Sequence, residues 1–357
     1  MDDSFAVFWG SLWSLFIIGL IVFFIWRRTK SGAPLKDGYR RFTLSKEDSV
    51  SQSLLLLSVL FLGATLLALN RDLGDPISWR AIFLVTSAAG LASAYYFKAV
   101  YLLTYGLIGA VSWWGIQAER WITGKGMRGG TLLAGLAWLA LISLVLGHLH
   151  GEKPKFKRFS LIYLGLGLFF ITGLLFFLST RAGLEALEEL TRGNPILRSW
   201  EVLLSLLLFG ASLTGLTLYA GSKKIVSRFE AWAVILLALL FGLVAFLPQQ
   251  RLFLRSGFST GRELSGSGIL WALLFNLVIF LELIGVIFSG YWRKEEWVIN
   301  LGALLLFLLI TVKYFDWFFT FLDKGIAFIG AGILLFVVGW LMEKGRRYMI
   351  SNVKAGP

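Results

Sequence analysis

The sequence contains no cysteine and only two histidines, His148 and His150. Without cysteine the chain forms no disulfide, offers no thiolate to a metal and has no cysteine nucleophile. The two histidines stand two positions apart near a predicted helix end, so they face different ways, and no carboxylate cluster accompanies them. Two such ligands make a poor metal site. We therefore expect neither a metal nor a cofactor.

Charged residues are scarce as well. They make up 15% of the chain, whereas 57% is hydrophobic, with 31 Phe and 15 Trp. Soluble domains carry about a quarter charged residues, so this composition predicts that lipid is the solvent. The formal net charge of +13 is compatible with nucleic-acid binding. No recognisable nucleic-acid-reading module accompanies it, and we expect no nucleic-acid partner.

Apolar runs recur along the chain, each about long enough for a helix to cross ~30 Å of hydrocarbon. We predict an all-α fold, a polytopic integral membrane helical bundle with about eleven transmembrane helices. The predicted spans cover residues 5–26, about 46–69 (capped by Ser45 with Asp48), 81–97, 99–117, 130–147, 160–179, about 195–221, 231–247, 269–290, 297–312 and 325–342.

The third and fourth spans come from one long apolar run that only Lys98 interrupts. A single helix over residues 81–115 would be ~50 Å long, too long for one span even when tilted. We therefore predict two helices that are joined by a tight turn. Asp75-Pro76 and Asn194-Pro195 predict the starts of the third and seventh spans, since proline at the first helical position loses no intrahelical bond.

Three other segments carry local signals. In the sixth span, Gly165, Gly167 and Gly173 predict close approach of a neighbouring backbone. Residues 184–190 have the spacing of a short amphipathic surface helix, which either lies on the membrane or, in the interpretation we prefer, is solvated. Residues 248–268 are rich in Gly, Ser and Arg and predict an irregular, mobile loop.

Charges beside the spans predict the orientation. The first span follows Asp2 and Asp3 and precedes Arg27 and Arg28, the reverse of a secretory signal peptide. We therefore place the N-terminus outside and the C-terminus in the cytoplasm, which leaves most of the 34 Lys and Arg on the cytoplasmic side. We expect two regions, residues 1–50 with the first helix and a basic loop, and residues 51–357 with the multi-helix transmembrane domain.

The basic loop interleaves aromatic and cationic side chains at Tyr39, Arg40, Arg41 and Phe42. This pattern suits contact with anionic lipid headgroups, at about 1 kcal/mol per cation. The alternative is an ordinary cytoplasmic loop of a membrane protein, in which the charges set only the orientation.

Glu282 is the one acidic or basic residue that we place deep inside a predicted span, away from its ends. A carboxyl in hydrocarbon costs several kcal/mol and by default marks a functional site. Asn276, six residues earlier, lies on a different helical face, whereas Asn300 on the next span is expected at a similar depth and able to meet Glu282. The functional interpretation is a proton-titrating carboxyl; the structural one is a glutamic acid that joins two helices by hydrogen bonds.

Lys313 and Asp316 end the tenth predicted span and stand three residues apart, which suits an ion pair at the outer interface. We interpret the pair as structural, with a lysine that reaches the interface along its aliphatic stem. No paired carboxylates within a span and no serine–histidine set indicate catalysis, so we do not expect an enzyme.

The C-terminal third carries short motifs, Asn300-Leu301-Gly302, Lys313-Tyr314-Phe315-Asp316, Lys324-Gly325 and Lys344-Gly345-Arg346-Arg347. In these it resembles the ending of a bacterial family of membrane proteins known as domain of unknown function 2157. The front of the chain departs from that family, because an extra span and a basic loop replace its soluble helical segment. The resemblance implies a multi-pass protein of the bacterial cytoplasmic (inner) membrane and assigns no functional residue.

Two functions remain open on this sequence. The first is a membrane-embedded scaffold or assembly partner, which contacts membrane lipids and a membrane-protein partner. The second is a transporter in which Glu282 couples a proton to movement of an apolar or amphiphilic substrate. Carriers of polar solutes place several polar groups around a midplane site. The spans here offer few such groups, which favours the scaffold.

The predicted orientation is tested by reporter fusions or labelling at the Arg40–Arg41 connector. We expect this connector in the cytoplasm, because Lys and Arg are retained on that side of the membrane. A periplasmic position, or a single crossing by residues 81–117, would contradict the proposed topology.

Overall fold

The structure is a computed structural model that describes residues 46–193, 199–255, 262–318 and 324–355. The chain divides into two compact units, Met1–Ser58 and Val59–Pro357. The described part of the first unit is the beginning of α2 (Lys46–Asp72), a helix that continues into the second. The predicted first span, residues 5–26, lies outside the described residues.

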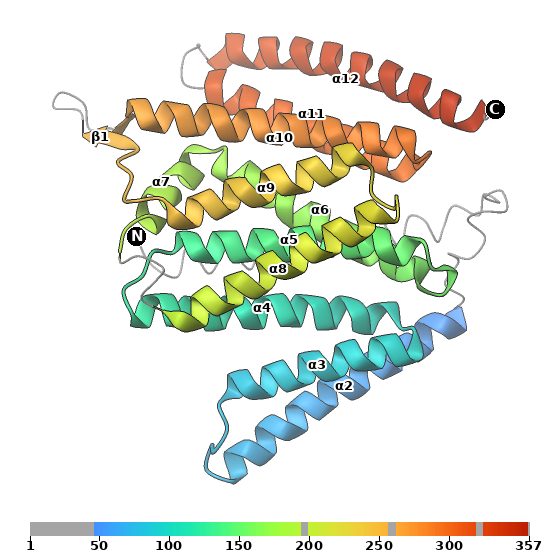
Figure 1. Cartoon of the computed structure of the whole chain (residues 1–357). Coiled ribbons are helices and arrows are strands. Elements are labelled where there is room, and N and C mark those ends of the chain that lie inside the picture. Colours follow the sequence, from blue (N-terminus) through green and yellow to red (C-terminus); the bar gives the residue numbers. More distant parts are fainter. Residues whose placement is uncertain (1–45, 194–198, 256–261, 319–323, 356–357) are drawn as a thin grey trace. The chain divides into compact units, whose positions relative to one another are not determined.

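The second unit is almost entirely helical (Figure 1). Its further elements are α3 (Trp79–Phe97), α4 (Val100–Gly124), α5 (Gly130–Gly151), η2 (Pro154–Phe156), α6 (Lys157–Leu178), α7 (Arg181–Leu190), α8 (Trp200–Ser222), α9 (Arg228–Phe246), β1 (Phe253–Arg255), β2 (Arg262–Leu264), α10 (Gly266–Trp292), α11 (Glu296–Phe318) and α12 (Lys324–Ala355). Among the described residues, seven helices are long and apolar enough to cross a membrane. This agrees with the predicted class, a helical membrane protein.

Helix α5 is the centre of the second unit. It packs against α4, α6, α8 and α9, while α10 packs against α6 and α11 (Figure 1). In the most apolar 18-residue stretch of α5, 44% of the residues are buried, whereas in the corresponding stretch of α10 the share is 17%. The core around α5 includes the fully buried side chains Leu141, Phe241 and Phe275. α5 is therefore enclosed by protein, and α10 exposes most of its apolar surface.

Small residues allow the other helices to approach α5 closely. Gly135 faces the indole ring of Trp114 on α4 with no room for a side chain. A Cβ at Gly167 of α6 would lie 2.8 Å from the backbone oxygen of Ala140 on α5. Gly167 thus has the role predicted for it. Around Gly165 and Gly173 no atom of another described helix lies within 4 Å of such a Cβ, so within the described part of the chain the predicted close approach is not found there.

The predicted break in the long apolar run is confirmed. α3 ends at Phe97 and α4 begins at Val100, with Lys98 between them in the left-handed region at φ 55°. Its backbone N–H donates to Ala94 O, as is usual where a left-handed residue ends a helix.

The predicted starts of the third and seventh spans need correction. The N-cap of α3 is Ser78, whose side chain accepts from Ala81 N. Asp75 instead lies in the preceding turn and accepts from Asn70 Nδ2 at 3.0 Å. α8 begins at Trp200, well after Asn194-Pro195, which lie outside the described residues.

Two connecting segments are more ordered than predicted. The 248–268 segment was expected to be irregular, but within it residues 253–255 and 262–264 pair as two short antiparallel strands, with Phe253 opposite Leu264. α7 was expected to be solvated, but Leu184 and Leu187 are 2% and 0% exposed and belong to the core around α5. In both segments apolar side chains pack into a core formed by helices that are distant in the sequence, so the pattern of the segment alone does not predict their burial.

Replacing Gly167 with alanine is expected to lower the free energy of unfolding by about 1–3 kcal/mol, because the new methyl group meets the α5 backbone. The matched control is Gly165→Ala on the same helix, where the space is open. There the higher helix propensity of alanine keeps or raises stability. Unfolding in mixed detergent micelles measures both, and equal effects would contradict the packing described here.

Candidate functional site

Glu282 projects from α10 toward α6. Thr172 Oγ1, on α6, donates to Glu282 Oε1 at 2.7 Å. The other carboxyl oxygen, Oε2, is buried and has no hydrogen-bond partner among the described residues. α10 brings the carboxyl there because its buried residues Phe275, Ile279 and Leu283 pack toward the core. The predicted intramembrane carboxyl therefore lies at a helix–helix contact.

Asn276 contacts α6 as well, but at the end of that helix. Its Nδ2 donates to Ala272 O at 2.7 Å and to Ser179 O at 3.3 Å. Lys313 of α11 also donates to Ser179 O through Nζ. A lysine is favourable at this position because the carbonyl groups at a helix C-terminus carry partial negative charge. α6, α10 and α11 are thus joined at the C-cap of α6.

Asn300 does not meet Glu282, so that prediction is wrong. Asn300 is exposed on α11, and its Oδ1 accepts from Arg346 Nη1 of α12 at 2.8 Å. Arg346 also forms an ion pair with Glu343. The hydrogen bonds of Arg346 hold the pKa of Glu343 well below its usual range, at about 2.

Other predicted site residues fall partly outside the described structure. The side chain of Asp316 is not among the described ones, and neither are Tyr39, Arg40, Arg41 and Phe42. The Lys313–Asp316 pair and the headgroup contact of the basic loop therefore stay predictions.

A pair that the sequence analysis missed joins α9 to α10. Arg293 donates to Glu230 through Nε at 2.8 Å and through Nη2 at 2.6 Å, and Ser289 Oγ donates to the same carboxylate at 2.6 Å. Burial by itself lowers the pKa of Arg293, but the bonds to Glu230 outweigh it and raise that pKa. The sequence signal was present, because Ser227 and Glu230 form a capping box.

A second missed carboxylate holds the segment before the hairpin. Glu188 of α7 is only 7% exposed. Its Oε2 accepts from the backbone N–H groups of Leu252 and Phe253, each at 3.0 Å, and Arg192 donates to Oε1 at 3.3 Å. The spacing of apolar residues predicted that α7 is amphipathic. It did not predict the partner of Glu188, because Leu252 is 64 residues away in the sequence.

His150 belongs to an aromatic cluster. Its Nδ1 lies 2.7 Å from Leu146 O and its Nε2 lies 2.9 Å from Tyr95 OH, which in turn bonds Tyr163 OH at 2.9 Å. The two rings of His150 and Tyr163 stack. Within the described residues no group of three His, Cys, Asp or Glu is placed to hold a metal ion.

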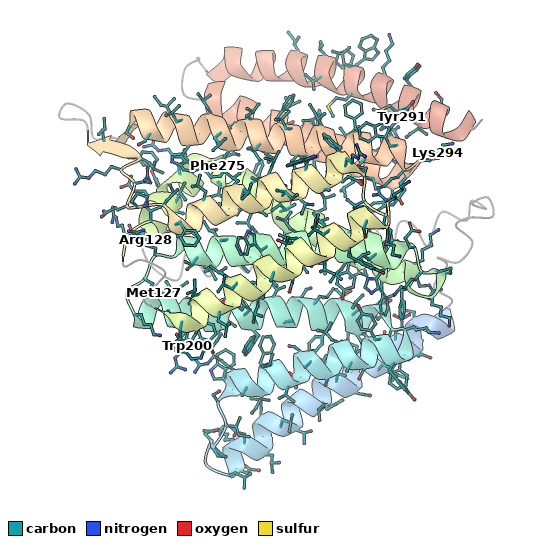
Figure 2. The ribbon with its side chains drawn as sticks, in the orientation of Figure 1. Met127, Arg128, Trp200, Phe275, Tyr291 and Lys294 are labelled. Carbon is teal, nitrogen blue, oxygen red and sulfur yellow. The ribbon has the colours of Figure 1, made fainter. Side chains whose placement is uncertain are left out.

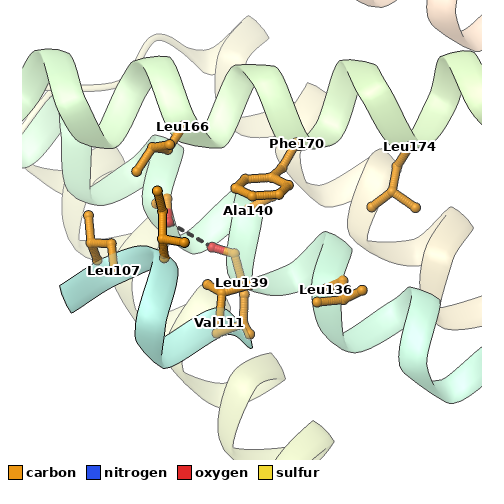
Figure 3. A pocket seen from close by; sticks show the side chains of 10 residues that line it. Leu107, Val111, Leu136, Leu139, Ala140, Leu166, Phe170 and Leu174 are labelled. Carbon is orange, nitrogen blue, oxygen red and sulfur yellow. Dashed lines mark hydrogen bonds between the residues drawn. The ribbon is translucent and has the colours of Figure 1, made fainter. Parts of the chain in front are cut away.

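Two cavities in the second unit are lined almost wholly by apolar groups. One, of about 120 Å³, lies between α4, α5 and α6 and is lined by residues such as Val111, Leu139 and Phe170 (Figure 3). Its polar residue, Ser143, donates to Leu139 O. The other, of about 330 Å³, lies between α2, α3 and Tyr105. Glu282 lines neither cavity.

Comparison with known proteins adds no identification. No family model, no curated protein and no solved structure matches this chain. The resemblance of the C-terminal third to domain of unknown function 2157 is therefore unsupported.

The Thr172–Glu282 bond makes a testable contribution to stability. Thr172→Val is expected to lower the free energy of unfolding by about 1 kcal/mol, in the range of interhelical hydrogen bonds in membranes. Thr217→Val is the control, because Thr217 Oγ1 is buried without a partner in the described structure. That control is expected to be neutral or stabilising, as measured by unfolding in mixed micelles. A smaller decrease in the free energy of unfolding for Thr172→Val than for Thr217→Val would contradict the assigned hydrogen bond.

Proposed function

We propose that this protein is a membrane-embedded scaffold or assembly partner of the bacterial inner membrane. In this proposal about eleven helices cross the bilayer, the N-terminus is outside, and the cytoplasmic face contacts anionic lipid. The protein has no catalytic role. Its seven described apolar helices supply the membrane character on which the proposal depends.

The observation that carries the proposal is the use of the polar groups inside the bundle. Thr172 bonds Glu282, Asn276 bonds the end of α6, and Trp138 Nε1 of α5 donates to Ala238 O of α9 at 2.9 Å. Each of these bonds joins one helix to another. The two cavities are also apolar, so neither offers a chain of polar groups to a hydrophilic solute.

Exposed apolar faces are available for a partner helix or for lipid. On α8, Leu207 and Leu208 are 61% and 57% exposed, whereas their neighbour Leu206 is 4% exposed. Lipid tails are as apolar as leucine, so shape and close packing decide whether such a face holds a second membrane protein. The proposal assigns at least one of these faces to a protein partner.

Site-specific photo-crosslinking tests this assignment. A photoreactive amino acid at Leu207 of α8, and at Leu273 of α10, which is 60% exposed, is expected to give a discrete protein adduct from at least one position in intact membranes. Leu206 is the matched control and is expected to give an intramolecular product only. Lipid adducts alone from every exposed helix face would contradict the scaffold.

One observation favours the second candidate function, a proton-coupled transporter. Glu282 Oε2 is buried and lacks a hydrogen-bond partner among the described residues, an arrangement that costs free energy and is often retained for function. In this alternative the carboxyl gains and loses a proton as an apolar or amphiphilic substrate moves.

The transporter alternative makes a direct prediction. Glu282→Gln is expected to abolish pH-dependent uptake or efflux in proteoliposomes while expression is retained, because an amide cannot carry the proton. Glu185→Gln, an exposed carboxylate on α7, is the control and is expected to keep the activity. Equal pH dependence in both variants would remove Glu282 from the mechanism.

A further inference from the structure

Three helix connections meet at one end of the second unit. They are the α5–α6, α8–α9 and α10–α11 connections. Arg293 Nη2 donates to Ile225 O at 3.1 Å and so joins the last two. Glu152 and Lys157 lie at the two ends of the α5–α6 connection. The charge of Glu152 acts to raise the pKa of Arg293, and the charge of Lys157 acts to lower that of Glu295, so this connection lies near the α10–α11 connection. Figure 2 shows Lys294 and Tyr291 at this end, opposite Met127, Arg128 and Trp200.

Four cations at this end, on the α8–α9 and α10–α11 turns, are exposed. No side-chain hydrogen bond or ion pair to the described part of the chain is formed by Lys223, Lys224, Arg228 or Lys294. At the opposite end several cations are paired: Lys125 bonds Glu201 at 2.6 Å, and Arg192 bonds Glu189 at 2.6 Å. The positive charge of Lys223, Lys224, Arg228 and Lys294 is therefore not compensated by an ion pair with a described residue.

Two of these exposed lysines occupy backbone positions that favour glycine. Lys224 and Lys294 have φ values of 57° and 55°, each just after a helix C-terminus. A residue with a side chain is disfavoured there by roughly 1–2 kcal/mol, whereas glycine is not. The same conformation is found at Lys98. A cation is favourable after a helix C-terminus, and glycine adopts this conformation without strain, so replacement by glycine removes the charge and keeps the turn.

Two exposed aromatic rings are close in sequence to Arg228 and Lys294. Phe229 and Trp292 are 50% and 57% exposed, and their ring centroids are 5.8 Å apart in an edge-to-face contact. They follow Arg228 and precede Lys294 by one and two residues. Exposed rings of this kind gather at the level of the headgroups in membrane proteins. The surface thus combines cations with an apolar shelf, the two properties that match a phospholipid.

Glu230, which lies two residues after Arg228, does not cancel this charge. Glu230 is already bonded to Arg293 and Ser289, so its negative charge is compensated within the bundle. The same ion pair, together with the bond from Arg293 to Ile225 O, joins the two turns that carry Lys224 and Lys294.

We propose that the α8–α9 and α10–α11 turns form a binding site for an anionic phospholipid of the surrounding bilayer. Lys224 and Lys294 contact the phosphate, with Lys223 and Arg228 adding to the positive field, and Phe229 and Trp292 lie along the first carbons of the acyl chains. This inference rests on the proposed function and names the described residues by which that face holds anionic lipid.

The test is the double variant Lys224→Gly and Lys294→Gly in lipid nanodiscs. The protein is extracted from nanodiscs of phosphatidylcholine and phosphatidylglycerol, and native mass spectrometry measures the lipids that stay bound. Among the lipids bound to the wild type, phosphatidylglycerol is expected to be enriched relative to its share of the nanodisc. In the variant this enrichment is expected to fall by a factor of about five for each lysine removed. In pure phosphatidylcholine its Tm is expected to be unchanged or higher, because glycine relieves the left-handed backbone.

The control variant, Arg71→Gln with Arg120→Gln, removes two exposed cations from the other end and is expected to keep the enrichment. Undiminished phosphatidylglycerol enrichment in the glycine variant would overturn the proposed site. So would a fall of its Tm in pure phosphatidylcholine, since the lysines would then act on the helix ends alone. Either result leaves the Leu207 and Leu273 cross-links untouched, so the scaffold proposal is judged separately.

Discussion

The close approach of helices to α5 is the constraint on which the rest of the structure depends. In lipid each helix satisfies its own backbone hydrogen bonds, so packing and a few polar bonds hold the helices together. α5 is lined with small residues, among them the fully buried Ala134 and Ala137. Trp114 fits over Gly135, and α6 packs at Gly167. Larger side chains at these points would separate α4 and α6 from the centre.

Polar groups then connect helices that small residues have brought close. Glu188 holds the chain before the hairpin, and Glu230 holds Arg293 of a neighbouring helix. Both carboxylates are near helix ends and have several donors, so the cost of their partial burial is compensated. Glu282 differs, because Thr172 supplies its only hydrogen bond in the described structure. That difference, rather than its depth alone, distinguishes Glu282 as a candidate for function.

Some features of the candidate site could be predicted and others could not. The break at Lys98 followed from the length of hydrocarbon that a helix spans, and the position of Glu282 followed from its place in an apolar run. The expected contact of Asn300 with Glu282 was wrong because depth in the membrane does not determine which way a helix is rotated. Asn300 is turned toward Arg346 of α12. The Glu230–Arg293 pair was missed because the residues are 63 apart in sequence.

The sequence by itself determined the solvent, the helical class and the positions of most apolar helices, because these depend on composition and on the length of local runs. Tertiary structure alone decided that α5 is central, that α7 packs against α6 and α10, and that Glu282 meets Thr172. Those outcomes depend on the rotation and neighbours of each helix. Nearly uniform apolar faces do not encode rotation or neighbours locally, and only the fit of side chains between helices settles them.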